Sequence, residues 1–207
     1  MHDYEYDIFI SYRRLDKDWD RWARKHVAGV LKTHLQPALG EPKIFIDDQI
    51  QTGDSWPARL SYALARSRLL VPLLCPAYFM SDWCQLELFL MCERERLCGL
   101  RCISNPAVLI LPFVFNDGDS FPAEVKAMQS KVIHDATPFI VRDTPKFLEF
   151  SETLRQECPR IQAALKKVPP FDPAWETITH DRFRKRFQIQ TATHQKTAPS
   201  LSLSPLK

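Results

Sequence analysis

Short apolar runs that alternate with predicted helices constrain the fold of this chain most. The runs are rich in strand-forming residues and too short for helices. They lie at residues 6–12, 43–47, 69–75 and 108–115, with a weaker run within 131–141. Helices are predicted between and after them, over residues 16–35, 57–67, 82–97, 123–129 and 144–158. Strands that alternate with helices predict an α/β domain with a doubly wound, parallel sheet of about five strands.

Internal prolines indicate where these elements are irregular. Pro72 lies in the third run and Pro112 in the fourth. Because proline cannot donate a hydrogen bond to a sheet, a bulge or an irregular strand is expected at Pro72. Pro159 is expected to break or kink the last helix, with a second segment continuing to residue 168.

Composition excludes several classes of protein. The chain has 207 residues and a net charge of +3, which is too small by itself to indicate a nucleic-acid-binding protein. No apolar run reaches the roughly 18 residues that a membrane-spanning helix needs. The first residues are polar and acidic, which is not typical of a secretory signal. We therefore expect a cytoplasmic protein that contacts neither nucleic acid nor membrane.

The six cysteines do not predict a metal site. They form no Cys-x-x-Cys pair, and no two histidines have the spacing of zinc ligands. Three of them, Cys75, Cys84 and Cys92, lie in apolar or helical segments, where a free cysteine behaves as a small hydrophobic residue. Reduced thiols and no resident metal or cofactor are expected.

The carboxyl ends of the predicted strands carry the polar groups of interest. Right-handed crossovers place these ends at one edge of the sheet, where ligands of open α/β proteins bind. Arg13 and Arg14 follow the first strand directly, and Asp47 and the loop 48–56 follow the second. The two arginines can grip phosphate groups in a bidentate manner. The alternative is a solvated basic turn.

The helix after the third strand opens with Ser-Asp-Trp-Cys-Gln-Leu-Glu at residues 81–87. Positions i and i+4 share one helix face, so Trp83 and Glu87 stand side by side. A carboxylate beside a flat aromatic ring can hold a cationic, ring-bearing substrate. The alternative is a solvated Glu87 and a core Trp83. The arginines and the loop at the same edge favour a functional cleft.

Three segments together resemble the Toll/interleukin-1 receptor (TIR) domain family. They are residues 6–14, residues 44–47 with the loop to residue 56, and residues 81–87. The resemblance extends over about residues 4–140 and less completely to 168. It implies a flavodoxin-like fold. TIR domains divide into signalling adaptors and enzymes that cleave NAD⁺, and the enzymes resemble this chain in having a glutamate four residues after a tryptophan.

The resemblance implies a role for each of these positions. Glu87 is then the catalytic carboxylate and Trp83 a wall of the nicotinamide pocket. Three residues correspond to positions that line the nucleotide site: Tyr12, Arg13 and Arg14. Asp47, at the end of the second predicted strand, is expected to bind the substrate as well. The loop 48–56 corresponds to the BB loop, which often completes the site of a neighbouring subunit, where Trp56 would stack on the substrate.

The implied function is that of an NAD⁺ glycohydrolase or cyclase. It releases nicotinamide together with ADP-ribose, or a cyclic or conjugated ADP-ribose signal, and NAD⁺ is the substrate rather than a cofactor. The resemblance also implies self-association through TIR–TIR contacts, a separate sensor or effector protein, and a setting in prokaryotic antiphage immunity. The alternative is an adaptor without enzymatic activity that acts by homotypic assembly.

The chain beyond the predicted TIR domain, residues 1–168, has a different composition. Residues 169–189 begin with a proline-rich linker and continue with aromatic residues among arginines and a lysine. Because aromatic side chains usually become buried, docking of this extension on the domain is favoured over binding of acidic partners. Residues 190–207 are rich in threonine, serine, proline and lysine, which predicts a disordered tail.

Overall fold

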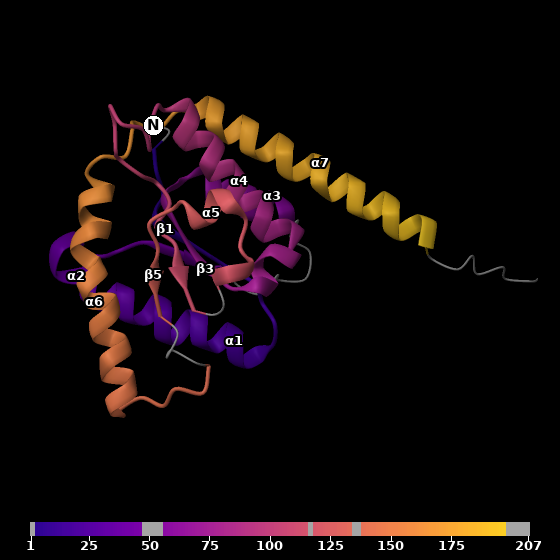
Figure 1. The fold of residues 1–207 in the computed structure, drawn as a ribbon. Helices are drawn as coiled ribbons and strands as arrows, with labels where there is room; N and C mark the ends of the chain where they lie inside the picture. The colour runs from indigo at the N-terminus through magenta and orange to yellow at the C-terminus, as the bar shows by residue number, and fades with distance from the viewer. Residues whose placement is uncertain (1–2, 47–55, 116–117, 134–137, 198–207) are drawn as a thin grey trace, which may run out of the picture.

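The computed structural model describes residues 3–46, 56–115, 118–133 and 138–197, and for Trp56, Asp119 and residues 189–197 it describes the backbone alone. Its centre is a sheet of five parallel strands in the order β2-β1-β3-β4-β5 (Figure 1). The strands are β1 (Tyr6–Tyr12), β2 (Ile44–Ile46), β3 (Ser67–Leu74), β4 (Phe113–Val114) and β5 (Lys131–Val132). The parallel, five-stranded α/β fold predicted from the sequence is confirmed.

Helices cover both faces of the sheet (Figure 1). One face carries α1 (Lys17–Arg21), the π-helical η1 (Trp22–Ala28), α2 (Gly29–Leu39) and α6 (Pro145–Leu165). The other carries α3 (Trp56–Ala65), α4 (Asp82–Leu97) and α7 (Pro173–Thr197). Short helical turns complete the chain at η2 (Pro76–Met80), η3 (Gly118–Ser120) and α5 (Ala123–Lys126). None of the helices in the described ranges is long and apolar enough to cross a membrane.

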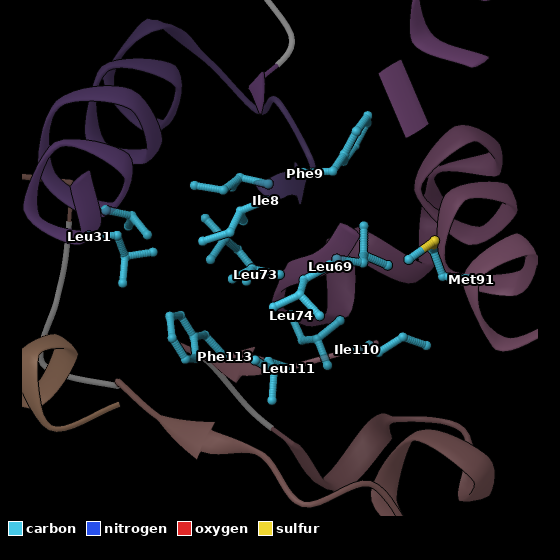
Figure 2. Close-up of a cluster of buried hydrophobic side chains, with 14 of the residues drawn as sticks. Ile8, Phe9, Leu31, Leu69, Leu73, Leu74, Met91, Ile110, Leu111 and Phe113 are labelled. Carbon is cyan, nitrogen blue, oxygen red and sulfur yellow. The ribbon is translucent and has the colours of Figure 1, made fainter. Parts of the chain in front are cut away.

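The hydrophobic core forms on both faces of β1 and β3. Ile8, Phe9 and Ile10 are at most 1% exposed, and β3 is buried over nearly its whole length. Figure 2 shows Leu31 of α2 on one side of the strand side chains and Met91 of α4 on the other. A strand that is buried on both faces needs a continuous apolar run, which is why these strands could be predicted from the sequence.

The fourth strand is shorter than predicted, and Pro72 supplies the reason. The backbone groups of Leu70 and Leu74 bond to the segment 109–115, so Pro72, midway between them, faces the same neighbour. Proline has no N–H to donate there. The ladder is accordingly interrupted between an isolated bridge from Leu70 to Ile110 and β4, which begins at Phe113.

Pro159 was predicted to break or kink the last helix of the domain, and the predicted break is wrong. The helix α6 is continuous from Pro145 to Leu165 with Pro159 inside it. Pro159 lies on the exposed face, as does Arg155, whose carbonyl loses its usual helical donor four residues later. Water can hydrate that carbonyl, so the helix continues at a tolerable cost.

The C-terminal extension forms the long helix α7, which packs against α3 and crosses α4. Trp175 is 5% and Phe183 is 1% exposed, which confirms docking for these two residues, whereas Phe187 remains 43% exposed. The helix continues to Thr197, into the stretch for which disorder was predicted. That stretch contains neither glycine nor proline before Pro199, so an existing helix can propagate through it. The division at residues 168 and 189 stays a prediction.

Candidate active site

A cavity of about 280 Å³ lies where the strand order reverses. The strand β1 lies between β2 and β3 in the sheet. The connections to these two neighbours run over opposite faces of the sheet, so they diverge at the carboxyl end of β1. Residues 9–14 of β1 and the turn after it form one side of the cavity. Ser81 and the first turns of α4 form the other side. This is the usual ligand position in doubly wound sheets.

The structure brings together five of the seven predicted site residues. Tyr12, Arg13, Arg14, Trp83 and Glu87 all line this cavity. Asp47 and the loop at 48–55 lie outside the described residues. Trp56 begins α3, but its side chain is not described. The placement of these two residues beside the cavity therefore remains a prediction.

Glu87 is a buried carboxylate, with 5% of the residue exposed. Ser11, which is 1% exposed, donates a hydrogen bond from Oγ to Glu87 Oε2. The Tyr78 hydroxyl lies 2.8 Å from Ser11 Oγ and donates to the Cys84 carbonyl at 3.0 Å. Burial without such partners would cost a carboxylate several kcal/mol, on the order of the penalty for any unpaired buried charge. The Ser11 hydroxyl therefore orients the Glu87 carboxylate.

Neighbouring groups that titrate remain neutral around Glu87. Burial raises the pKa of the Tyr78 hydroxyl well above its ordinary value, and the nearby Cys84 and Glu87 raise it further. Burial likewise raises the pKa of the Cys84 thiol, with the Glu87 charge as the next cause. Both groups thus stay protonated at neutral pH.

The start of α4 sets the direction in which Glu87 points. Ser81 is the N-cap, and its Oγ accepts a hydrogen bond from the Cys84 amide at 3.4 Å. Asp82 in the first turn suits the helix dipole. With the first turn fixed, Trp83 and Glu87 follow on one face, as the spacing predicts.

Asp20 of α1 organises the basic side of the cavity. Its carboxylate accepts a hydrogen bond from the Tyr12 hydroxyl, and it pairs with Arg14 Nε at 3.3 Å and Arg24 Nε at 3.0 Å. Burial raises the pKa of Asp20, but the hydrogen bonds from Tyr12 and Arg24 outweigh it, so the pKa is lower than usual. Burial and the bond to Asp20 raise the pKa of Tyr12. Asp20 is therefore ionised at neutral pH and fixes both Tyr12 and Arg14.

The two arginines differ in their surroundings. The charge of Arg14 is partly compensated by Asp20, which also pairs with Arg24. Arg13 is exposed, and no ion pair is recorded for it within the described part of the chain. Trp83 is partly buried and stacks on Phe183 of α7, with ring centroids 5.7 Å apart and planes inclined by 26°. The cavity thus combines a cationic rim, an aromatic side and a buried carboxylate.

Ser11, Tyr78, Cys84 and Asp20 were not predicted as site residues. A weak signal existed for Ser11, which is a polar residue directly after the apolar residues Ile8, Phe9 and Ile10 of β1. Asp20 lies four residues before Arg24, the spacing of a helical ion pair. Tyr78 gave no signal, because its contact with Ser11 spans 67 positions of the chain.

No metal chemistry is indicated by the residues that the structure describes. They contain no group of three or more histidine, cysteine, aspartate or glutamate side chains placed to hold a metal ion. All six cysteines are free thiols, and Cys84 beside the cavity is buried.

Two solved structures are similar to this chain. The chain is similar to the TIR domain of the Toll-related receptor TRR-2 from Hydra magnipapillata, with 15% identity, 74% of this chain and 98% of that one covered, and a TM-score of 0.43. It is also similar to the TIR domains of the activated Roq1 resistosome, which recognises the pathogen effector XopQ. That similarity has 21% identity, coverage of 88% and 99%, and a TM-score of 0.39. The comparison with curated proteins found no match.

The TIR domain family model matches residues 8–129, which is more than half of the chain. The matched segment contains β1 from Ile8 onwards, the residues that line the cavity and all of α4, so it includes both Trp83 and Glu87. The chain belongs to the TIR domain family.

Proposed function

We propose that this TIR domain cleaves the bond between ribose and nicotinamide in NAD⁺, with Glu87 as the catalytic carboxylate. The single observation that carries the proposal is the buried Glu87 carboxylate, which the Ser11 hydroxyl holds inside a cavity that also carries Arg13 and Trp83. A solvated charge would need neither burial nor a dedicated donor. The alternative of a merely structural Glu87 does not account for its position at the strand switch point.

The chemistry of NAD⁺ suits a site with one carboxylate. Nicotinamide is cationic while bound to ribose and leaves as a neutral molecule, so its departure requires no general acid. The ribose carbon develops positive charge in the transition state, and a nearby carboxylate stabilises it electrostatically. Among the residues that line the described cavity, Glu87 is the acidic one.

Other lining groups fit the remainder of the substrate. Trp83 offers a flat aromatic surface to a cationic ring, and Arg13 and Arg14 offer charge to the pyrophosphate. The cavity of about 280 Å³ is at the lower end of ligand sites, so it matches the nicotinamide riboside part of NAD⁺ better than the whole dinucleotide. We propose that a second copy of the chain completes the site by self-association, with the loop 48–56 as the contributing segment.

The proposal is tested by incubating the concentrated full-length protein with NAD⁺ and following nicotinamide release by chromatography. Release that rises more than linearly with protein concentration would support both cleavage and self-association. Absence of release at every concentration, including under crowding agents that promote assembly, would favour the adaptor function instead. Mass spectrometry of the second product separates ADP-ribose from a cyclic or conjugated form and so bears on the proposed role in antiphage immunity.

Arg13→Ala is expected to raise KM for NAD⁺ about tenfold with little change in kcat, because one charged contact to phosphate is worth about 1–1.5 kcal/mol. Arg14→Ala should raise KM only about twofold, since Asp20 already compensates the Arg14 charge. Steady-state kinetics at two salt concentrations check that Arg13→Ala raises KM more than Arg14→Ala does. Added salt should reduce the difference between the two KM values, because it screens charge. Arg155→Ala, on the exposed face of α6, is the matched control. Equal effects of the Arg13 and Arg14 substitutions would contradict the assignment.

A further inference from the structure

The C-terminal helix α7 reaches the candidate active site through the Trp83 side chain. The segment that matches the TIR family ends at residue 129, so α7 lies outside it. Phe183 of α7 is 1% exposed, and its ring is stacked on the indole of Trp83. Trp83 in turn lines the cavity that contains Glu87. An element outside the matched domain is therefore in direct contact with a side of the cavity.

Ion pairs hold α7 against the start of α4. Arg186 pairs with Asp82, the first residue of α4, and Arg182 lies 3.8 Å from Glu93 further along that helix. Phe183 and Arg186 are three positions apart and so share one face of α7. They contact the consecutive residues Trp83 and Asp82, which fixes α7 beside the helix turn that carries the indole.

Packing on α3 anchors the same segment of α7. Ser61 Oγ lies 3.2 Å from His180 Nδ1, and Arg66 pairs with Glu176 at 2.9 Å. The helix α7 packs more extensively against α3 than against α4. The helix α7 therefore contacts two helices, α3 and the helix α4 that carries Glu87.

We propose that Phe183 is a positioning residue that holds the Trp83 indole as a wall of the substrate pocket. Trp83 is only partly buried, whereas Phe183 is 1% exposed and fixed within the interface of α7. Stacking on this buried ring limits the rotamers that the indole can adopt beside the cavity. The identity of the bound ring rests on the proposed function, whereas the fixed position of Trp83 does not.

Kinetics of a matched pair of variants test the proposal. Phe183→Leu keeps an apolar side chain in the buried site but removes the ring, and Phe183→Ala removes most of the side chain. Phe150→Ala, a buried phenylalanine of α6 on the opposite face, is the control for general loss of stability. We expect both Phe183 variants to raise KM for NAD⁺ about fivefold at nearly constant kcat, because the orientation of a substrate contact is lost. Phe150→Ala should leave KM unchanged. Equal KM effects at Phe183 and Phe150 would overturn the proposal.

A spectroscopic readout separates this inference from the proposed function. The indole N–H resonance of Trp83 is assigned in ¹⁵N-labelled protein with the Trp83→Phe variant, and spectra of Phe183→Leu and wild type are compared without ligand. The proposal predicts a shifted or broadened Trp83 signal, since the ring current and the fixed rotamer are both lost. An unchanged signal would overturn it even if NAD⁺ is cleaved. A wild-type protein that neither binds nor cleaves NAD⁺ would refute the proposed function, while the Trp83 signal still decides whether Phe183 positions the indole.

Discussion

Glu87→Gln is expected to lower nicotinamide release about 10³-fold, with the protein still folded. The amide has nearly the shape of the carboxylate and can accept the hydrogen bond that Ser11 donates. What it lacks is the negative charge that stabilises the developing ribosyl cation inside a buried site. Removal of one preorganised electrostatic group from an active site typically costs about 10²–10³ in kcat, and here the described lining of the cavity supplies no second acid.

Folding stability should move in the opposite direction. Burying a neutral amide costs less than burying a charge, so the melting temperature of Glu87→Gln should equal or exceed that of wild type. Calorimetry measures the melting temperature of Glu87→Gln, and chromatography measures its nicotinamide release. Glu152→Gln, on the exposed surface of α6, is the control and should change neither quantity. Undiminished release by Glu87→Gln would remove Glu87 from the mechanism, and a destabilised variant would point to a structural role.

The position of this site was predictable because its parts depend on local rules. Burial on both faces made β1 and β3 continuous apolar runs, and the end of such a run placed Arg13 and Arg14 at the sheet edge. The cap at Ser81 fixed the phase of α4, so the spacing of Trp83 and Glu87 translated directly into one helix face. Each of these inferences requires knowledge of only a few consecutive residues.

The partners of those residues were not predictable, because they depend on packing between distant segments. Ser11 and Glu87 are separated by 76 positions, and nothing local indicates that the Ser11 hydroxyl faces α4 rather than the opposite side of the sheet. The same holds for Phe183, whose burial on Trp83 follows from the course of the whole of α7. At Pro72 the sequence predicted an irregular strand, but it did not show which strand would be affected. The shortened strand is β4, since the N–H that proline lacks would face that strand.

Ser11→Ala is expected to lower kcat about 10- to 100-fold with little change in KM. A hydrogen bond to a charged group is worth about 1.5–3 kcal/mol, which corresponds to this range of rates when the charge acts in the transition state. Steady-state kinetics and a pH–rate profile of wild type and Ser11→Ala measure this loss.

Two comparisons distinguish orientation of Glu87 from a general loss of stability. Ser67→Ala removes another buried serine hydroxyl, which donates to the Ala63 carbonyl far from the cavity, and it should leave kcat and the pH profile unchanged. In a Glu87→Gln background, Ser11→Ala should have almost no further effect, since residues that act as a unit are not additive. A full additional loss in that background would show that Ser11 acts independently of Glu87. Wild type, the two single variants and the double variant form a double-mutant cycle. Its coupling energy measures how much of the catalytic effect of Glu87 depends on Ser11, a residue that the sequence alone did not connect to it.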